Sequence, residues 1–237
     1  MVSQNEIARQ IGDWLNARKN QKIALGTKRF FKEKINPRGL KVPAVRNLEK
    51  EIWNQNKKEL TLDFCLSLTE KLFDTAYWED PVVGMGLTRR FEKEFDESTF
   101  RRFEKWVGRY ISNWAHCDDL CTHLIAPLIK KNSKLAKKLV GWADSKNRWK
   151  RRASIVPFVP LAKHGFYPNE ILRISKLLLK DQDDDLVAKA NGWTLREFGK
   201  YSQPKLILFL KSNRNKIPRV TMRYALERTP ANLKKGL

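Results

Sequence analysis

Apolar residues recur along this chain every three or four positions, which is the spacing of an amphipathic α-helix. In residues 3–18 this stripe consists of Ile7, Ile11, Trp14 and Leu15. No stretch alternates apolar and polar residues in the way that half-buried strands do. Proline and glycine lie mostly where helices should begin or end. The pattern therefore predicts an all-α protein.

Further helices are expected at regular intervals. One begins just after Val42 and Pro43, because proline suits the first turn of a helix. The others are expected at residues 61–73, 81–95, 98–110, 111 to about 130, 133–142 and 218–227. Between the first two helices lies the basic segment 28–34, followed by the turn-rich 36–39. This segment is interpreted as either a binding loop or a solvated connector.

Two later segments resemble each other. Ala190 lies 37 positions after Ala153, and Lys200 lies 37 positions after Lys163. This offset is close to the length of a two-helix HEAT-type repeat. Such repeats stack into a curved solenoid whose concave wall is a binding surface. We expect one HEAT-like repeat domain over residues 1–237, with an ordinary helical bundle as the alternative.

The charge of the chain identifies a class of partner. The sequence has 48 Lys and Arg against 26 Asp and Glu, a net charge of +22 and a pI of about 10.1. Self-repulsion on this scale opposes compactness unless a polyanion or counterions share the surface. Nucleic acid is the expected partner of such a chain. A merely basic soluble protein, or one that rests on anionic lipid, is the alternative.

Cysteine content and hydropathy favour a soluble protein of the cytosol or nucleoid. The cysteines Cys65, Cys117 and Cys121 form no even, spaced framework, which suits a reducing compartment. No run of eighteen or more apolar residues occurs, so neither a spanning helix nor membrane association is expected. The N-terminus mixes charged and apolar residues and lacks a signal-peptide stretch.

The segment 111–123 carries the candidate chemistry. Trp114 and Asp118 are four residues apart, so a helix presents both on one face. Such a pair suits a reaction in which positive charge develops near an apolar surface, because the ring attracts a cation and the carboxylate stabilises it. The alternative is that Trp114 belongs to the core and Asp118 to a helix start or the surface.

Metal and nucleotide sites are disfavoured. On one helix Cys117 and Cys121 share a face, whereas His116 and His123 each lie off it, so a zinc site would need a partner segment. We expect buried cysteines and ordinary polar histidines. The acidic run 181–185 lacks the glycine and distal glutamate of a calcium loop and suits the start of the next helix. No phosphate-binding glycine loop occurs.

A basic cluster surrounds Trp149 where a new helix should begin, and it consists of Arg148, Lys150, Arg151 and Arg152. Arginine side chains beside free backbone donors can bind phosphates, although each residue can equally be a solvated one. Further along, Trp193 follows Gly192, which leaves room for a close approach. The surface that approaches Trp193 belongs either to a ligand or to the preceding repeat, against which the tryptophan would pack.

Three motifs resemble those of the AlkD-like alkylpurine DNA glycosylases, a family built from HEAT-like repeats. They are N-W-A-H-C-D-D at 113–119, N-R-W-K-R-R-A at 147–153 and G-W-T-L-R-E-F at 192–198. Their order and spacing match the family, and the similarity extends from about Phe30 to the end. In some relatives a tryptophan replaces Asn113 and an aspartate replaces Ala115. These differences affect the expected range of lesions.

The resemblance implies a solenoid that holds double-stranded DNA along its basic concave face. It also implies a role for each matching residue. Asp118 resembles the catalytic carboxylate, Trp114 the tryptophan at the sugar of the damaged nucleotide, and Trp193 a second tryptophan wall. Arg152 is similar to the arginine that holds the DNA backbone near the lesion. The other DNA-binding candidates are Arg148, Trp149, Lys150, Arg151 and Arg196. An N-terminal aromatic residue also approaches DNA in the family, and either Phe30 or Phe31 can match it.

The activity implied is removal of cationic N3- or N7-alkylated purines, such as 3-methyladenine and 7-methylguanine, from duplex DNA. A positively charged purine leaves without protonation, and Asp118 can stabilise the oxocarbenium-like sugar or position water. We therefore expect a monomeric, monofunctional glycosylase that needs no metal and no cofactor. The alternative is a non-catalytic repeat protein for branched or distorted DNA, since related branches bind DNA with no known excision activity. A protein-binding scaffold is disfavoured by the charge.

Overall fold

A computed structural model describes residues 2–181 and 184–234 of the chain. These residues form α-helices joined by short turns, a few 3-10 segments and one π-helical turn, and no strand occurs among them. The prediction of an all-α class is confirmed. By Cα proximity the chain divides into two compact units, Met1–Ser98 with Arg109–Asp119 (unit 1) and Thr99–Gly108 with Leu120–Leu237 (unit 2). The expectation of one repeat domain stays a prediction.

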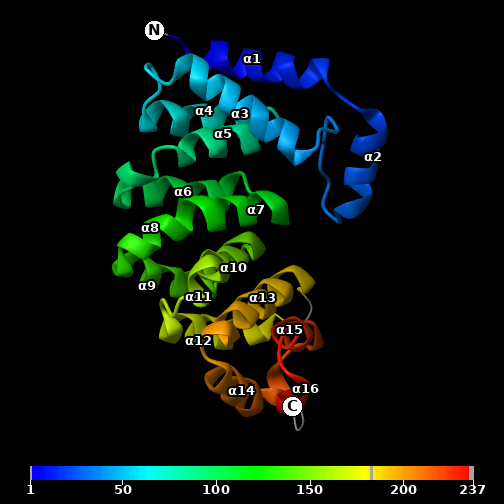
Figure 1. Ribbon diagram of the computed structural model, residues 1–237, viewed down its shortest axis with the longest axis vertical. Coiled ribbons are helices and arrows are strands. Elements are labelled where there is room, and N and C mark those ends of the chain that lie inside the picture. Colours follow the sequence, from blue (N-terminus) through cyan, green and yellow to red (C-terminus); the bar gives the residue numbers. More distant parts are fainter. Residues whose placement is uncertain (1, 182–183, 235–237) are drawn as a thin grey trace. The chain divides into compact units, whose positions relative to one another are not determined.

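Unit 1 contains six α-helices in its described residues (Figure 1). They are α1 (Gln4–Ala17), α2 (Gln21–Phe30), α3 (Val42–Asn56), α4 (Leu62–Asp74), α5 (Asp80–Arg89) and α7 (Trp114–Leu120, whose last residue belongs to unit 2). The predicted stripe of α1 is buried at Ile7, Ile11 and Leu15. It packs with apolar residues of α3, α4 and α5 in one core, which fixes the frame of the unit.

The turn before α3 is held by two buried acidic residues. The carboxylate of Glu79 accepts the backbone N–H groups of Arg38, Gly39 and Leu40 at 2.9, 2.8 and 3.2 Å. The guanidinium of Arg38 forms a buried ion pair with Asp80. Gly39 has a φ of 92°, and a Cβ there would meet a backbone oxygen at 2.0 Å. The turn-rich segment is therefore a fixed part of unit 1 rather than a solvated connector.

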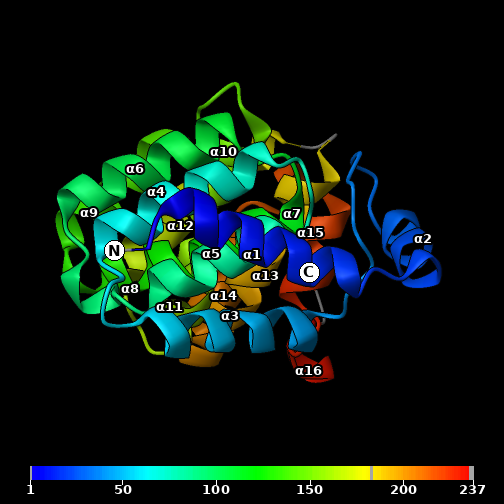
Figure 2. The same cartoon turned by 90° about the horizontal axis from the view of Figure 1, so that it is seen from above.

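Helix α2 is absent from the sequence predictions, which assigned the basic segment 28–34 to a loop. Lys28, Arg29 and Phe30 form its last turn, and the side chain of Asn20 caps its start by accepting the N–H of Ile23. No residue of the helix is fully buried, and its apolar stripe reaches only the half-buried Ile23, Ala24 and Thr27, so the helix adds little to the core. Both views show α2 beyond the C-terminal end of α1 (Figures 1 and 2).

Unit 2 contains most of α6 (Glu97–Arg109) and the remaining helices. These are α8 (Ala126–Lys131), α9 (Ser133–Trp142), α10 (Arg148–Ile155), α11 (Val159–Ala162), α12 (Pro168–Leu177), α13 (Asp185–Tyr201), α14 (Gln203–Ser212), α15 (Arg219–Ala225) and α16 (Ala231–Lys234). Phe100, Phe103 and Trp106 of α6 are buried, as their spacing predicts. The sequence analysis did not identify α12 or α14.

The two similar segments of unit 2 form corresponding helical runs that differ in continuity. Residues 148–162 are broken into α10, the 3-10 segment Val156–Phe158 and α11, whereas α13 is uninterrupted. Pro157 and Pro160 explain the break, because proline has no N–H for the helical hydrogen bond. Within the described part of the chain, no helix is both long and apolar enough to cross a bilayer.

Candidate functional site

Trp114 and Asp118 lie one turn apart on α7, as their spacing predicts. The side-chain oxygen of Asn113 accepts the backbone N–H of His116 at 3.0 Å and so caps the start of this helix. Both Trp114 and Asp118 are partly exposed. An indole ring and a carboxylate thus project from one short helix of unit 1.

Two phenylalanines of the α2 end surround the indole of Trp114. Phe31 stacks on it with ring centroids 5.0 Å apart and an interplanar angle of 13°. Phe30 meets it edge-on at 5.8 Å and is 73% exposed. Of the two aromatic residues that the sequence left open as alternatives, Phe31 therefore covers one face of Trp114. Phe30 is the one that presents its ring to solvent.

The carboxylate next to Asp118 has a structural partner. Asp119 Oδ1 lies 2.9 Å from Nη2 of Arg46, which belongs to α3. The side chain of Asp119 is 13% exposed, so this ion pair is partly shielded from solvent and links α7 to α3.

A π-helical turn follows directly after α7. It spans Cys121–Ile125, and the N–H of Ala126 donates to the carbonyl of Cys121, five residues earlier. Pro127 comes next and has no N–H to continue the α-helical pattern. Single π turns occur frequently at functional sites, and this one begins three residues after Asp118.

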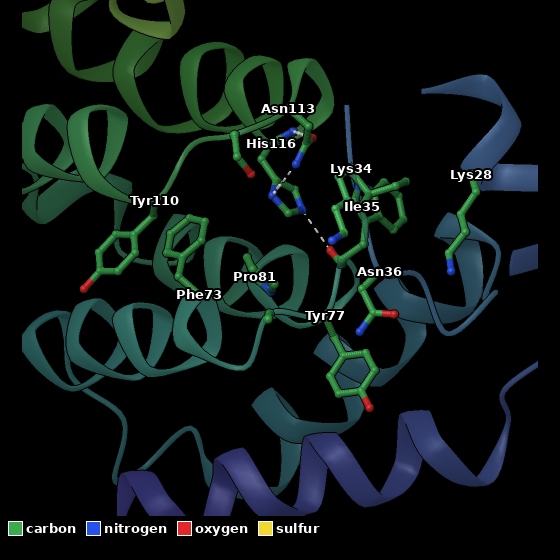
Figure 3. Close-up of a pocket in the computed structure, with 13 residues that line it drawn as sticks. Lys28, Lys34, Ile35, Asn36, Phe73, Tyr77, Pro81, Tyr110, Asn113 and His116 are labelled. Carbon is green, nitrogen blue, oxygen red and sulfur yellow. Dashed lines mark hydrogen bonds between the residues drawn. The ribbon is translucent and has the colours of Figure 1, made fainter. Parts of the chain in front are cut away.

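A cavity of about 440 Å³ opens in unit 1 beside α7 (Figure 3). His116 lies at its wall, buried, with Nε2 2.8 Å from the carbonyl oxygen of Trp78 and Nδ1 3.0 Å from the amide nitrogen of Asn113. A carbonyl only accepts, so Nε2 carries the proton, and Nδ1 accepts from the amide. Burial lowers the pKa of His116, while the bond to Trp78 and the charge of Asp119 oppose this shift.

His116 is therefore a neutral, fully bonded side chain and not the ordinary polar histidine that the sequence predicted. Its ring stacks on that of Trp78, which in turn contacts Phe31. The cysteines agree with expectation, since Cys65, Cys117 and Cys121 are all buried and none of them forms a disulfide. Burial raises the pKa of Cys65 to about 12, which keeps the thiol protonated. No metal-binding group of His, Cys, Asp and Glu occurs among the described residues.

The basic cluster of α10 is paired with carboxylates within unit 2. Arg148 Nε lies 3.0 Å from Asp184, and Arg151 lies 2.7 Å from Asp181 and 3.2 Å from Asp184. Burial nevertheless raises the pKa of Asp181, with Arg151 acting in the opposite direction. Arg148 keeps 47% of its side chain exposed, whereas Arg151 keeps 14%. Arg148 is thus the more accessible of the two to a phosphate.

Other members of the cluster are also engaged. Lys150 pairs with Glu104 at 2.7 Å, Arg152 is buried and donates to the carbonyl of Leu186, and Trp149 is buried. The expectation of free backbone donors at this helix start is wrong in part, because the side chain of Asn147 accepts the N–H groups of Trp149 and Lys150. The ion pairs were not visible in the sequence because their partners come from other segments, whereas the Asn147 cap is local and is typical of a helix start.

The acidic run behaves as its position predicts. Asp184 is the N-cap of α13 and its side chain accepts the N–H of Leu186, while Asp185 lies in the first turn. Gln182 and Asp183, the other members of the run beside Asp181, lie outside the described residues. The run also supplies the carboxylates that pair with Arg148 and Arg151, a second role that the sequence did not indicate.

Trp193 and Arg196 lie on α13. Trp193 is partly exposed, and Arg196 forms ion pairs with Glu197 and Glu227. A Cβ on Gly192 would meet Cβ of Tyr224 at 2.5 Å, and Tyr224 belongs to α15. The glycine therefore allows close helix packing against α15, a later helix, rather than against the preceding repeat. Trp193 and Arg152 belong to unit 2 and Trp114 to unit 1, so their convergence on one groove stays a prediction.

Sequence reasoning missed the residues that line the cavity, above all Trp78, Tyr77 and Tyr110. Their contacts join segments far apart in the chain, so no local motif marks them. One local signal was available for this wall. Asn113 precedes His116 by three residues, a spacing at which an asparagine side chain caps a helix and also reaches the histidine ring.

Comparison with known proteins agrees with this arrangement. Residues 11–229 match the family model described as DNA alkylation repair enzyme. A solved structure described as a predicted DNA alkylation repair enzyme from Enterococcus faecalis is similar, with a TM-score of 0.77 and 15% sequence identity. The likeness covers 90% of this chain and 97% of that one, and at this identity it establishes the fold. A search of curated proteins found no match. Because the family model spans most of its length, the chain belongs to the family of DNA alkylation repair enzymes.

Proposed function

We propose that the protein is a monofunctional DNA glycosylase that hydrolyses the N-glycosidic bond of cationic N3- and N7-alkylated purines in duplex DNA. The observation that carries the proposal is the pair Trp114 and Asp118, one turn apart and partly exposed on α7, in a chain of the DNA alkylation repair family. The aromatic residues Phe30 and Phe31 beside the pair add apolar surface at the same place.

The reaction needs no general acid. Alkylation at N3 or N7 makes the purine positively charged, so the electrons of the breaking C1′–N9 bond neutralise the departing base. The sugar becomes oxocarbenium-like, and the carboxylate of Asp118 stabilises this charge. Water then bonds to C1′ and loses a proton, for which Asp118 is the acceptor. The indole of Trp114 attracts the cationic sugar through its π face.

The remaining candidates bind DNA in this proposal. Trp193 forms a second wall at the sugar. Arg152, whose buried guanidinium donates to the carbonyl of Leu186, holds the backbone near the lesion once a phosphate replaces that partner. Arg148, with half of its side chain exposed, is the best placed member of its cluster to contact a phosphate while retaining Asp184 as a partner. Lys150, Arg151, Trp149 and Arg196 support this surface through their packing and ion pairs.

The proposal is tested by base release from methylated duplex DNA. The wild type should release 7-methylguanine and 3-methyladenine, and Asp118→Asn should lower the release rate by about 100-fold or more, as expected when a group that stabilises transition-state charge is removed. DNA affinity at matched salt should change less than about twofold, since the reacting carboxylate adds little to binding. Asp13→Asn, a change at an exposed position of α1, is the control and should release base at the wild-type rate.

Two results would contradict the proposal in different ways. Wild-type protein that binds DNA tightly but releases no base would favour a non-catalytic DNA-binding protein. Undiminished release by Asp118→Asn would keep the activity and remove Asp118 from it.

A further inference from the structure

The cavity of unit 1 has no role in the glycosylase proposal, and its walls have distinct chemical character. At one side the rings of Phe73 and Tyr110 stack at 5.0 Å with an interplanar angle of 4°. At the other side lie Asn36, Lys34 and Lys28 (Figure 3). A volume of about 440 Å³ is in the range of small-molecule sites. One end is thus aromatic, and the other is polar and cationic.

The charge of the cavity has one sign. Lys28 and Lys34 line it, and no carboxylate is among the described residues that do. Neither lysine forms an ion pair with another described residue. Glu79 and Asp80, close in sequence to the lining residue Trp78, are bound to the 38–40 turn instead. An anionic group is therefore favoured at the lysine end.

A buried donor in the cavity wall also lacks a partner. The indole N–H of Trp78 is inaccessible to solvent and donates to no described residue, although Trp78 lines the cavity. Buried N–H groups in native proteins are nearly always paired, because an unpaired one forfeits its hydrogen bond to water. Because this atom has no accessible surface, a ligand oxygen in the cavity would reach it only after the Trp78 ring moved.

We propose that this cavity binds a nucleoside monophosphate unit, with its base against the Phe73–Tyr110 pair and its phosphate at Lys28 and Lys34. Bases stack on aromatic side chains whatever their identity, and lysine ammonium groups neutralise phosphate charge. The side chains of Asn36 and Ser112 add hydrogen-bonding groups at the wall. The unit comes either from a free mononucleotide or from a nucleotide turned out of a DNA strand. The inference goes beyond the glycosylase proposal and does not depend on it.

The first experiment measures the binding of deoxyadenosine monophosphate to the full chain by saturation-transfer NMR and by tryptophan fluorescence. Lys34→Met removes a charge at an exposed position and should weaken binding about tenfold, as expected for a charge-assisted contact. Lys57→Met removes an equal charge at an exposed position after α3, outside the cavity lining, and should change binding less than about twofold. Ser112→Trp fills the cavity from an exposed position and should abolish binding.

The second experiment identifies the source of the unit. Affinities are compared for a duplex with one unpaired nucleotide and for the same duplex fully paired. If the strand supplies the unit, the wild type and Lys57→Met prefer the duplex with the unpaired nucleotide, and Ser112→Trp loses the preference. If only the free mononucleotide binds, all three proteins treat the two duplexes alike.

The proposal is overturned if neither experiment shows an effect of the cavity. That outcome would be equal binding of deoxyadenosine monophosphate by wild type, Lys34→Met and a folded Ser112→Trp, or no binding at all, together with no preference for the unpaired nucleotide. Base release from methylated DNA is measured on the same proteins. Its presence or absence bears on the glycosylase proposal alone.

Discussion

At the scale of single residues, His116 is the side chain whose protonation is most tightly linked to the fold. Its two ring nitrogens bond to the carbonyl of Trp78 and to the amide of Asn113, and the ring is buried. If Nδ1 were protonated, its N–H would point at the amide N–H of Asn113, and two donors form no hydrogen bond with each other. Protonation therefore costs a hydrogen bond as well as the burial of a charge.

This linkage predicts a pH dependence of stability. The folded pKa of His116 lies below its unfolded value of about 6.5, so the unfolded chain binds more protons as pH falls through that value. Stability from the neutral ring is thus fully present above about pH 6.5 and is lost below it. Relative to His116→Gln, the free energy of unfolding of the wild type should fall by up to about 2 kcal/mol between pH 7.5 and pH 5. The full decrease applies when the ring stays neutral in the folded protein over this whole range.

Urea unfolding at the two pH values measures this difference. His164→Gln is the matched control, because His164 is exposed and its loss should leave the pH dependence unchanged. Parallel pH profiles for wild type and His116→Gln would show that the imidazole is not linked to folding.

Some contacts of single residues could be predicted from the sequence and others could not. The pair Trp114 and Asp118 was identified correctly as sharing one helical face, because a four-residue spacing is a local property of a helix. The stacking of Phe31 on Trp114 was not predicted, since it joins positions 83 residues apart. The ion pairs of Arg148 and Arg151 were missed for the same reason.

At the scale of elements, the close crossing of α13 and α15 depends on a single missing side chain. A Cβ added at Gly192 would lie only 2.6 Å from the backbone oxygen of Thr221 and 2.5 Å from Cβ of Tyr224. Both neighbours are part of a packed helix, so the contact is relieved only if α15 shifts.

Substitutions of two helical glycines should consequently have opposite effects. Gly192→Ala should lower the free energy of unfolding by about 1–3 kcal/mol, the usual cost of overpacking. Gly141→Ala, in α9 with nothing within 4 Å of the added Cβ, should raise it by about 0.5–1 kcal/mol through helix propensity. Thermal or urea unfolding followed by circular dichroism measures both. A Gly192→Ala protein as stable as the Gly141→Ala protein would contradict the close packing.

Helix boundaries were predictable where capping and an apolar stripe coincide. Residues 133–142 were assigned correctly to a helix, and the side chain of Asn132 caps it. Helix α2 was missed because it buries no side chain. Its place is fixed instead by the turn that Glu79 and Asp80 bind. The apolar residues of α2 do recur at helical spacing, but contacts distant in sequence, such as the bond from the N–H of Asn20 to the carbonyl of Arg38, decide where the helix lies.

At the scale of the whole molecule, the dominant property is the net charge of +22. Several arginines of unit 2 are compensated by carboxylates, but the excess of cations remains for the chain as a whole. Binding to duplex DNA then releases condensed counterions, and each phosphate contact contributes about −0.9 to the slope of log K against log salt concentration.

We therefore predict a steep salt dependence of DNA binding. With roughly six or more phosphate contacts, affinity should fall about 1,000-fold between 50 and 200 mM salt. Fluorescence anisotropy with a labelled duplex at several salt concentrations measures the slope. A slope near zero would show that the cationic surface does not contact phosphates and would favour a partner other than nucleic acid.

Four properties could be derived from the order of the amino acids alone: the all-α class, most helix positions, the cationic character and the shared helical face of Trp114 and Asp118. These properties follow from periodicity, composition and local spacing, which are fixed by neighbouring residues. Only the tertiary structure decided that Phe31 covers Trp114, that His116 is neutral and that residues from Lys28 to His116 enclose one cavity. Those features arise where distant segments pack, and the packing of side chains across such contacts has no local signature in the chain.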